Sequence, residues 1–395
     1  MINSVCGIRS TGRICTDIAE ILEEQGHECK IAYGRENVPE KYEKYAIKIG
    51  NKMTVYCHAL KARLFDLAGF GSKAATHKLI KQIKEYNPDI IHLHNLHGYY
   101  LHVGELFKFL KIYNKPVFWS FYDCWPFTGH CAHFDFNQCE QWKTNCKKCT
   151  YKKEYPASIF DGAKRNYQAK KSLFTGVSNL QIIVPSYWMQ TMVGQSYMRD
   201  YPVHVLPNGI ALSSFVKTES EFRKKMGLQE KFVILGVSSF WNNMKGLELF
   251  NRLANELDVE NFQVVLVGKA EERTLSNNIL HIPATNNIQE LCELYTTADI
   301  FVNPTLQETQ GLTTVEALAC GTPAIVFNSG GAAECIDSTC GVSVAKNNYE
   351  DLRDAIRRVE SGELKFDSLN CVKAAQRYDA KKLYQHFIEL YENLV

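Results

Sequence analysis

The chain has 395 residues, of which 45% are hydrophobic and 22% are charged, with a formal net charge of +2. This length is enough for two ordinary domains with full cores, and the composition excludes a disordered chain. The small net charge gives no general attraction to nucleic acid, so we expect no nucleic-acid partner, and no apolar run is long enough to span a membrane.

The chain opens with a short apolar segment, a glycine-containing loop and an amphipathic helix. Residues 3–6 are expected to end a first strand, residues 7–12 to form the loop and residues 14–24 to form the helix. This order is typical of a Rossmann-like domain. A phosphate-binding P-loop is excluded, because Arg13 stands where Lys-Ser/Thr is required. The start of the chain lacks the apolar core of a signal peptide, so the sequence predicts a reduced, cytoplasmic protein.

Residues 41–86 are locally basic. Ten Lys and Arg residues against three Asp and Glu residues give this segment a net charge of +7. Large apolar side chains are interleaved with these charges, namely Val55, Leu60, Leu64, Phe65, Leu67 and Phe70. A basic, apolar helical region suits an anionic membrane surface, and a solvated helical face is the alternative. We therefore predict peripheral binding to the inner face of the cytoplasmic membrane, with the solvated face kept as the alternative.

Polar side chains follow two buried strands of the first half. Residues 90–94 form the first strand, in which His92 alternates with His94, and Asn95 and His97 come at its carboxyl end. Residues 117–121 form the next strand, which is followed by Tyr122 and Asp123. Ligands of open α/β sheets bind at the carboxyl ends of the strands, so these side chains are expected to line a cleft.

A cysteine-rich loop follows at residues 124–149. It contains Cys131, Cys139, Cys146 and Cys149, and the last two form a CxxC pair. Four cysteines can bind zinc tetrahedrally, but only one CxxC pair is present. Structural zinc, free thiols and a disulfide are all compatible with this pattern. Any metal here is expected to be structural, because four thiolates leave no coordination position open for chemistry.

The second half alternates strands and helices after a linker at Pro207. The expected strands are 232–237, 264–268, 279–283, 300–304 and 324–328. Residues 238–243 are expected to form a loop, and Lys245-Gly246 to open a helix. An ammonium group at a helix start opposes the helix dipole, which indicates a bound anion near Lys245.

The stretch from Asn303 to Glu334 combines two acids with a helix start. Seven residues separate Glu308 on the loop from Glu316 on the helix, and Gly311 lets the main chain approach a bound group. Carboxylates that accept sugar hydroxyls, beside amides that hold phosphate, suit a nucleotide-sugar. Ordinary surface glutamates are the alternative.

Several of these segments resemble glycosyltransferase family 4. The donor signature of these retaining enzymes is a Glu, seven residues, a Glu, an Ala-Leu-Ala helix and Cys-Gly-Thr-Pro, which matches residues 308–323. Residues 92–102 and 122–131 resemble its exopolysaccharide, capsule and O-antigen branch, and residues 207–210 resemble its linker. The resemblance implies an α/β chain of the GT-B fold, with two Rossmann-like domains facing a central cleft. The implied domains are an acceptor domain at 1–206, a donor domain at 207–376 and a returning helix at 377–395.

The resemblance also implies roles for individual residues. In the family the first acid, here Glu308, contacts the donor sugar, and the second, here Glu316, holds the ribose, while Lys245 contacts the diphosphate. The implied donor-binding residues are Lys245, Ser239, Gln310, Gly311, Leu312, Thr313 and Glu316. The implied catalytic residues are Glu308, Asp123 and Tyr122. The implied acceptor-binding residues are Gly7, Thr11, Arg13, His94, Asn95 and His97.

The expected function is therefore that of a retaining hexosyltransferase, with a UDP- or GDP-sugar as donor and a polyprenyl-diphosphate-linked saccharide as acceptor. No Asp-x-Asp pair occurs in the sequence, so we expect metal-independent catalysis without a cofactor, with Lys245 and helix amides neutralising the leaving group. Two departures from the family favour a catalytically weak or silent relative as the alternative. Tyr122 stands where the family has His, and Ala211 stands where it has Asp.

Overall fold

The computed structural model describes residues 1–285 and 287–394. The chain divides into two compact units. Unit 1 is Met1–Leu206 together with the C-terminal residues from Leu383 on, and unit 2 is Pro207–Lys382. Each unit contains one sheet of parallel strands.

Unit 1 is built on a seven-stranded sheet in the order β3-β2-β1-β4-β5-β6-β7. The strands are β1 (Ile2–Asn3), β2 (Ile31–Tyr33), β3 (Ala46–Lys48), β4 (Ile91–Leu93), β5 (Val117–Ser120), β6 (Leu180–Val184) and β7 (Val203–Val205). All neighbouring pairs are parallel, so a crossover connects each strand to the next. The central strands β1, β4, β5 and β6 are buried, because helices and loops cover both faces of the sheet there, whereas the edge strands β3 and β7 are half-buried or exposed.

The α-helices of unit 1 are α1 (Arg9–Glu24), α2 (Lys52–Phe65), α3 (Lys73–Tyr86), α4 (Val103–Leu110), α5 (Ala163–Phe174) and α6 (Tyr187–Gly194). Short 3₁₀ helices are η1 (Glu40–Tyr45), η2 (Trp125–Phe127), η3 (Asp135–Asn137) and η4 (Gln141–Lys143). Aromatic rings fill the core under α4 and α5. The Trp119 ring lies 5.1 Å from the Phe107 ring and 5.0 Å from the Phe174 ring, centroid to centroid.

Unit 2 is built on a six-stranded parallel sheet in the order β10-β9-β8-β11-β12-β13. Its strands are β8 (Phe232–Phe240), β9 (Phe262–Lys269), β10 (Ile279–Ile282), β11 (Ile300–Asn303), β12 (Ala324–Phe327) and β13 (Gly341–Val344). Counted within the unit, this is the strand order 3-2-1-4-5-6 of the Rossmann fold. The five strands expected from the sequence in this half are all present, and β13 is an additional one.

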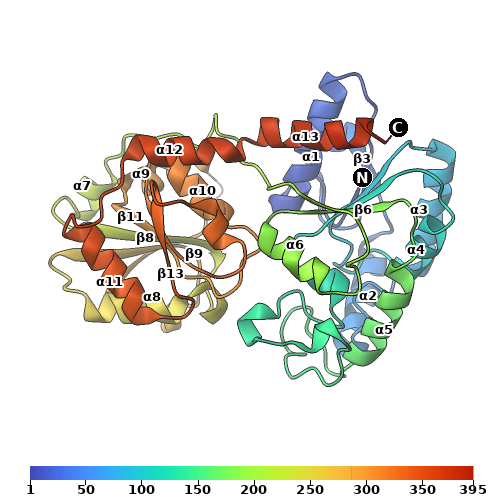
Figure 1. Cartoon of the computed structure of the whole chain (residues 1–395), viewed down its shortest axis with the longest axis horizontal. Coiled ribbons are helices and arrows are strands. Elements are labelled where there is room, and N and C mark those ends of the chain that lie inside the picture. The colour runs from blue at the N-terminus through green and yellow to red at the C-terminus, as the bar shows by residue number, and fades with distance from the viewer. Residues whose placement is uncertain (286, 395) are drawn as a thin grey trace. The chain divides into compact units, whose positions relative to one another are not determined.

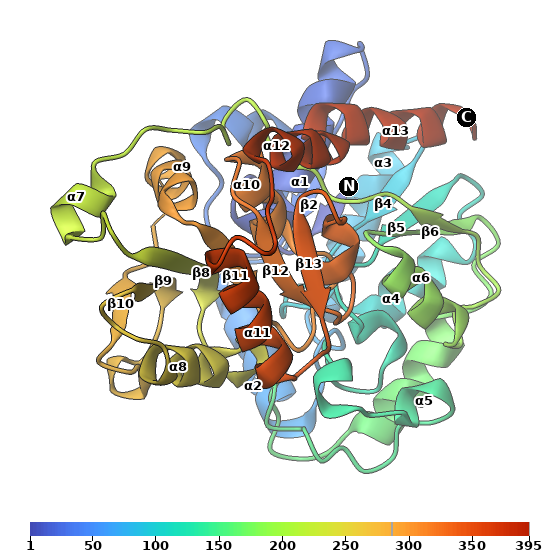
Figure 2. The same ribbon diagram turned by 60° about the vertical axis from the view of Figure 1, so that its left-hand side comes forward.

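The helices of unit 2 are α7 (Phe222–Met226), α8 (Leu247–Glu256), α9 (Ile288–Thr297), α10 (Leu312–Ala319), α11 (Tyr349–Glu360) and α12 (Ser368–Ala375), with η5 (Asn243–Lys245), η6 (Glu272–Thr274), η7 (Ala332–Cys335) and η8 (Gln376–Tyr378). Helices α9, α10 and α12 lie over one face of the sheet, and α8 and α11 lie over the other (Figures 1 and 2). Both faces of β11 and β12 are therefore buried, as their unbroken apolar sequences indicate.

The last helix, α13 (Ala380–Glu392), begins in unit 2, and its residues from Leu383 on belong to unit 1. There the Tyr391 hydroxyl lies 2.5 Å from Nδ1 of His92, and the Tyr391 ring lies 5.1 Å from the Phe118 ring. This helix covers the face of the seven-stranded sheet that also carries α1 (Figure 1). Within the described residues, no helix combines the length and apolar character needed to cross a membrane.

Candidate active site

The candidate donor residues of unit 2 gather at the carboxyl edge of its sheet. Because all six strands are parallel, the loops after β8, β11 and β12 leave the sheet at the same edge. Lys245 follows β8, the segment from Glu308 to Glu316 follows β11, and Gly330 follows β12. This edge is where open α/β sheets bind ligands.

Lys245 and Glu308 form an ion pair at this edge. The Lys245 ammonium group lies 2.5 Å from Oε2 of Glu308, and each side chain is 26% exposed. The backbone N–H of Lys245 donates to Oδ1 of Asn242 at 3.0 Å. The next residue must be glycine, because Gly246 has a φ of +82° and a Cβ there would lie 2.6 Å from Cγ of Pro304. The anion expected beside Lys245 is thus supplied, in this structure, by the Glu308 carboxylate.

The turn after β12 supports the main chain of Glu308. The N–H of Gly331 donates to the Glu308 carbonyl at 2.8 Å. Gly330 has a φ of +58°, and a Cβ there would lie 1.9 Å from the same carbonyl oxygen. Residues 330 and 331 therefore fix the Glu308 loop through a backbone contact that requires glycine.

The segment from Gln310 to Thr313 forms the start of α10. Gly311 precedes the helix with a φ of +124°, a conformation that favours glycine. The first N–H groups of α10 have no partner within the helix, which makes this end suitable for phosphate. The Gln310 amide oxygen accepts from the backbone and side-chain N–H groups of Asn208 at 2.8 and 2.9 Å. Only the main chain of Gln310 is therefore available to a ligand, whereas Leu312 and Thr313 are half-buried in the first turn.

Glu316 lies one turn into α10 and is held by Tyr295 on α9. The Tyr295 hydroxyl donates to Oε2 of Glu316 at 2.7 Å. Tyr295 is fully buried, and burial together with the Glu316 carboxylate raises its pKa well above the ordinary value. The hydroxyl is therefore a fixed donor that orients Glu316. No local sequence pattern indicates this contact, because it joins two helices.

Ser239 lies on strand β8, and not in a loop as the sequence predicts. Strand β8 continues to Phe240, which pairs with Lys269 of β9 beyond a bulge, so the expected loop at 238–243 starts later than predicted. Ser239 is exposed at this end of the strand. Among the described residues, no hydrogen bond joins its side chain to Lys245 or Glu308.

In unit 1, His94 and Tyr122 form a buried pair at the carboxyl edge of the other sheet. Nδ1 of His94 lies 2.8 Å from the Tyr122 hydroxyl, and the two rings stack 6.0 Å apart. Burial lowers the pKa of His94 well below its usual value and raises that of Tyr122. Neither group is charged at neutral pH. Nε2 of His94 is buried without a hydrogen-bond partner in the described structure.

His97, Asp123 and Tyr155 form a second polar chain beside that pair. Nε2 of His97 lies 2.6 Å from Oδ2 of Asp123, and Nδ1 lies 3.0 Å from the Tyr155 hydroxyl. Burial acts to raise the pKa of Asp123, but the charges of His97 and His133 and the hydrogen bonds from His97 and the Trp125 N–H together lower it below its ordinary value. Asp123 also accepts from the N–H of Trp125 at 2.9 Å. Sequence reasoning missed Tyr155, which is distant in the chain.

Two of the remaining acceptor-side residues, Thr11 and Asn95, are connected through Asn3, which is fully buried. Its amide donates to Oγ1 of Thr11 at 3.3 Å, and its Oδ1 accepts from the N–H of Asn95 at 3.2 Å. Gly7 has a φ of +72°, and a Cβ there would lie 2.4 Å from the Tyr42 ring. Arg13 lies on the exposed side of α1. Asn3 is thus a site-forming residue that the sequence pattern did not identify.

The structure groups five of these side chains around one small cavity of about 10 Å³, lined in part by His94, Asn95, His97, Tyr122 and Asp123. His92 does not join them, although the sequence suggested three histidines at a strand exit. It is 2% exposed and bonds to Tyr391 and Ser120, so its role is to pack the core. A larger cavity of about 580 Å³ lies at the opposite, amino edge of this sheet and contains none of the predicted site residues in its lining.

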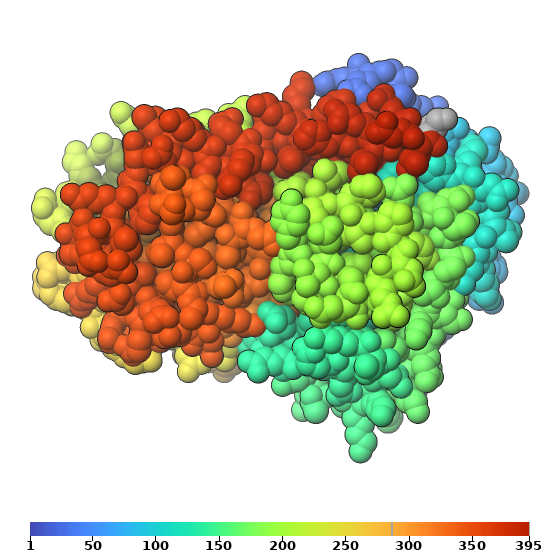
Figure 3. Space-filling view, in the orientation of Figure 1, coloured from blue at the N-terminus to red at the C-terminus, as the bar shows by residue number. Residues whose placement is uncertain are grey.

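The cysteine-rich loop lies on the surface of unit 1 (teal and green in Figure 3). All four cysteines are free thiols and line one cavity of about 30 Å³. The N–H of Gly129 donates to Sγ of Cys146 at 3.2 Å. Within the described residues, however, no group of three or more His, Cys, Asp or Glu side chains is arranged to hold a metal ion. The zinc site stays a prediction.

Comparisons with known proteins identify the family. A family described as "Glycosyltransferase Family 4" matches residues 11–214, and one described as "Glycosyl transferases group 1" matches residues 231–361. These two matches cover the candidate residues of both sheets from Thr11 on.

Individual proteins agree with this assignment. A glycosyl transferase named for colanic acid biosynthesis, WcaC of Escherichia coli (strain K12), is 24% identical over 402 residues, which cover 96% of each chain. The Campylobacter jejuni N,N'-diacetylbacillosaminyl-diphospho-undecaprenol alpha-1,3-N-acetylgalactosaminyltransferase is 28% identical over 47% of this chain and 53% of its own. Anabaena HepE, solved in complex with UDP, has a TM-score of 0.67 at 16% identity, covering 100% of this chain and 99% of its own. With a family match over more than half of its length and two Rossmann-like units, this chain belongs to glycosyltransferase family 4 and has the GT-B fold.

Proposed function

We propose that this glycosyltransferase retains anomeric configuration and moves a sugar from a nucleotide-sugar to a polyprenyl-diphosphate-linked saccharide in cell-surface polysaccharide biosynthesis. The observation that supports this most is the arrangement in unit 2, where the Lys245–Glu308 pair lies at the same sheet edge as the start of α10 and Glu316. It offers charge for a diphosphate and carboxylates for sugar hydroxyls.

The donor is a UDP- or GDP-sugar in this proposal. Glu316, oriented by Tyr295, accepts hydrogen bonds from the ribose, and the main chain from Gln310 to Leu312 meets the phosphates. The ion pair keeps both partners in place before the donor arrives. On binding, the Lys245 ammonium turns to the diphosphate, and Glu308 becomes free to accept from the sugar. The UDP in the HepE structure supports a uridine nucleotide.

Charge neutralisation of the leaving diphosphate requires no metal in this scheme. Lys245 and the free N–H groups of α10 stabilise the negative charge that develops as the sugar–phosphate bond breaks. Asp123 and Tyr122 are the catalytic candidates of unit 1, where His97 holds Asp123 and His94 holds Tyr122. Because Tyr122 is uncharged at neutral pH, it can only offer or accept a hydrogen bond there.

The names of two relatives support the proposed acceptor and the proposed cellular location. The Campylobacter jejuni enzyme acts on a diphospho-undecaprenol-linked sugar by its name, and the Escherichia coli protein is named for colanic acid, which together support a lipid-linked saccharide in polysaccharide or O-antigen synthesis. Such an acceptor resides in a membrane, so the enzyme works peripherally on the inner face of the cytoplasmic membrane.

The direct test is titration calorimetry with UDP, GDP and dTDP, followed by turnover with the matching sugar donors. Glu316→Ala should weaken nucleotide affinity roughly 10- to 150-fold, because a charge-assisted hydrogen bond contributes about 1.5–3 kcal/mol. Glu308→Ala should lower turnover and leave affinity for the free nucleotide nearly unchanged. Equal loss of nucleotide affinity in both variants would contradict these separate roles.

A catalytically silent relative is the second candidate, favoured by Tyr122 and Ala211 in place of the family residues. Such a protein would bind the nucleotide with the same dependence on Glu316. It would neither transfer nor hydrolyse the sugar at any enzyme concentration tested. Turnover therefore separates the two candidates.

A further inference from the structure

Helix α2 presents large apolar side chains to solvent. Met53, Tyr56 and Leu60 are 69%, 71% and 60% exposed. Their spacing of three and four residues places them on one side of the helix. The opposite side buries only His58 and Ala62 fully. An ordinary surface helix has its large apolar residues on the buried side, whereas α2 turns these three large apolar residues towards solvent.

The same surface continues beyond the end of α2. The rings of Phe65 and Phe160 stack with centroids 6.0 Å apart. The N–H groups of Ile159 and Phe160 donate to the carbonyls of Arg63 and Leu64 at 2.8 and 3.0 Å. Phe65, Ile159 and Phe160 are 48%, 52% and 60% exposed. We call the whole surface the α2 face, and it consists of Met53, Tyr56, Leu60, Phe65, Ile159 and Phe160.

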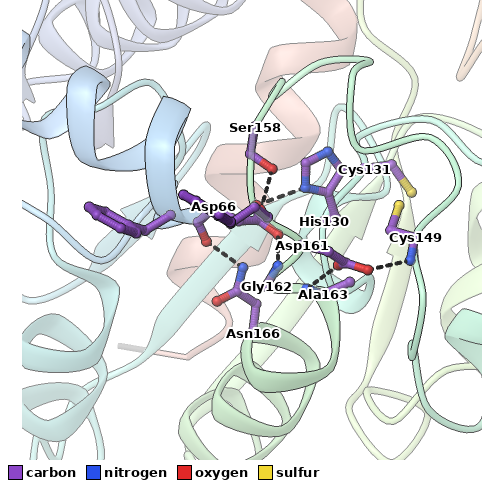
Figure 4. A network of polar contacts seen from close by, with 12 residues as sticks. Asp66, His130, Cys131, Cys149, Ser158, Asp161, Gly162, Ala163 and Asn166 are labelled. Carbon is purple, nitrogen blue, oxygen red and sulfur yellow. Dashed lines mark hydrogen bonds and ion pairs between the residues drawn. The ribbon is translucent and has the colours of Figure 1, made fainter.

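A buried polar network fixes the α2 face from behind (Figure 4). Asp66 ends α2 in the left-handed conformation, and its carboxylate lies 2.7 Å from Nδ1 of His130. The same carboxylate accepts from the N–H of Gly162 at 3.0 Å, and the Asp66 carbonyl accepts from the Asn166 amide at 2.6 Å. The end of α2, the 159–160 segment and the start of α5 are thus bonded to one another. The face is preformed and needs no rearrangement to bind.

The charges of α2 indicate what the face binds. The helix contains Lys52, Lys61 and Arg63, all exposed, and no Asp or Glu. Among the described residues, none of these three cations forms a salt bridge, whereas on α3 Lys73 pairs with Glu105 and Lys81 with Glu85. Apolar side chains flanked by unpaired cations match a bilayer with anionic headgroups, into which the apolar groups insert.

We propose that the α2 face docks unit 1 on an anionic phospholipid surface. This inference rests on the proposed lipid-linked acceptor, because docking brings the enzyme to the membrane that contains it. Within the basic segment 41–86, the proposal assigns the membrane contact to helix α2, together with the neighbouring residues Ile159 and Phe160. The alternative binding partner for an exposed apolar face is a second copy of the chain.

The experiment uses the full chain and vesicles of phosphatidylcholine with and without 30% phosphatidylglycerol. One variant is Met53→Ser/Tyr56→Ser/Leu60→Ser, and a second is Lys52→Gln/Lys61→Gln/Arg63→Gln. The matched control removes apolar side chains that are also exposed but lie elsewhere: Ile112→Ser/Val259→Ser/Leu369→Ser. All of these side chains are on the surface, so thermal unfolding should match the wild type.

We expect the wild type and the control to sediment with the anionic vesicles, and both α2 variants to bind at least tenfold more weakly. Binding should fall as salt rises, because ions screen the charges. Cys57 gives an independent readout, since it is exposed on α2 whereas the other cysteines are buried or half-buried. An environment-sensitive dye on Cys57 should shift to the blue with anionic vesicles only.

Vesicle binding that is equal in the wild type and both α2 variants would overturn the proposal. A dimer in solution that the serine variant converts to a monomer, without a change in vesicle binding, would assign the face to a second copy and also overturn it. Transfer to a short soluble acceptor should be unchanged in the α2 variants. If transfer is absent in every protein while vesicle binding depends on α2, the proposed function fails and the docking face stands.

Discussion

In the candidate donor region, some polar side chains are partly exposed to solvent, and others are buried and hydrogen-bonded within the protein. Lys245 and Glu308 are each 26% exposed, whereas Gln310 is 4% exposed and bonded to Asn208. A polar residue in a motif therefore does not by itself indicate a ligand contact.

Tyr295→Phe should weaken nucleotide binding about fivefold. The change removes the hydroxyl that donates to Oε2 of Glu316, and a net hydrogen bond contributes about 1 kcal/mol. Calorimetric titration with nucleotide measures the effect. Tyr349→Phe is the matched control, because it removes a similar Tyr–Glu bond, to Glu256, on another part of unit 2. A loss of the same size in both variants would show that the effect is not specific to Glu316.

Tyr122→Phe should lower the free energy of unfolding by about 1–3 kcal/mol. It leaves Nδ1 of His94 buried without its partner, which costs the desolvation of that nitrogen. Denaturant unfolding measures this loss. Tyr122→His should keep a hydrogen-bonding group at the position and cost less. Unchanged stability of the phenylalanine variant would show that the pair does not stabilise unit 1.

At the scale of elements, the stability of the α2 region depends on His58, which must stay neutral in the folded protein. His58 is 1% exposed, and its ring nitrogens lie 3.0 Å from Oγ of Ser72 and 3.1 Å from the carbonyl of Leu67. Burial lowers the pKa of His58 to about 4, with smaller effects from nearby His102 and Lys61. Below pH 6.5 the unfolded chain binds a proton that the folded chain does not, so stability falls as pH drops from 6.5 to 4.

The expected result is a steeper loss of stability between pH 6.5 and 4 in the wild type than in His58→Gln. The difference in slope has an upper limit of about 1.4 kcal/mol per pH unit. Denaturant unfolding at several pH values measures it. His27→Gln, at a half-exposed position, is the control and should keep the wild-type slope. Parallel curves for the wild type and His58→Gln would contradict a buried neutral imidazole.

The cysteine-rich loop gives a prediction that concerns metal. If it binds zinc, the purified protein should contain about one equivalent, and a chelator should loosen the loop without changing nucleotide affinity. Burial raises the pKa of Cys146 and of Cys149 to about 11, so zinc must displace protons and should bind more tightly as pH rises. Metal analysis measures the zinc content, also as a function of pH, and hydrogen exchange measures the loosening of the loop. Protein without metal, whose four thiols all react with a thiol reagent, would remove the prediction.

The sequence predicted β1, β4 and β5 of the first sheet and five of the six strands of the second, because their apolar runs end at clear loop signals, but it did not predict β2, β3 or β7. It also grouped Glu308, Gly311 and Glu316 as candidate donor residues, since they lie close together in the chain, and their roles stay a prediction. It did not predict Asn3, Tyr155 or Tyr295 as members of the candidate sites. Each of these makes its contact with a residue that is distant in sequence, and no local pattern encodes such a pair. The sequence also could not show that Leu60 faces solvent. Periodicity indicates which residues share one side of a helix, but it does not indicate which side is buried.

On the scale of the whole molecule, α13 makes unit 1 depend on the end of the chain. Tyr391→Ala removes a ring packed on Phe118 and the hydrogen bond to His92. We expect a loss of about 3–5 kcal/mol in the free energy of unfolding of unit 1. Hydrogen exchange should show weaker protection of β4 and β5, with the strands of unit 2 unchanged. Equal loss of protection in both units would show that they unfold as one.

The path of α13 also has a consequence for biosynthesis. Domains usually fold as they emerge from the ribosome, the first one first. Here the buried face of β4 and β5 receives Tyr391 only after all of unit 2 has been made, roughly 10–40 s later at about 5–20 residues per second. The first unit therefore waits with an apolar face uncovered until its last helix has been made. A chaperone that shields nascent chains should therefore bind unit 1 for longer than its early synthesis would indicate.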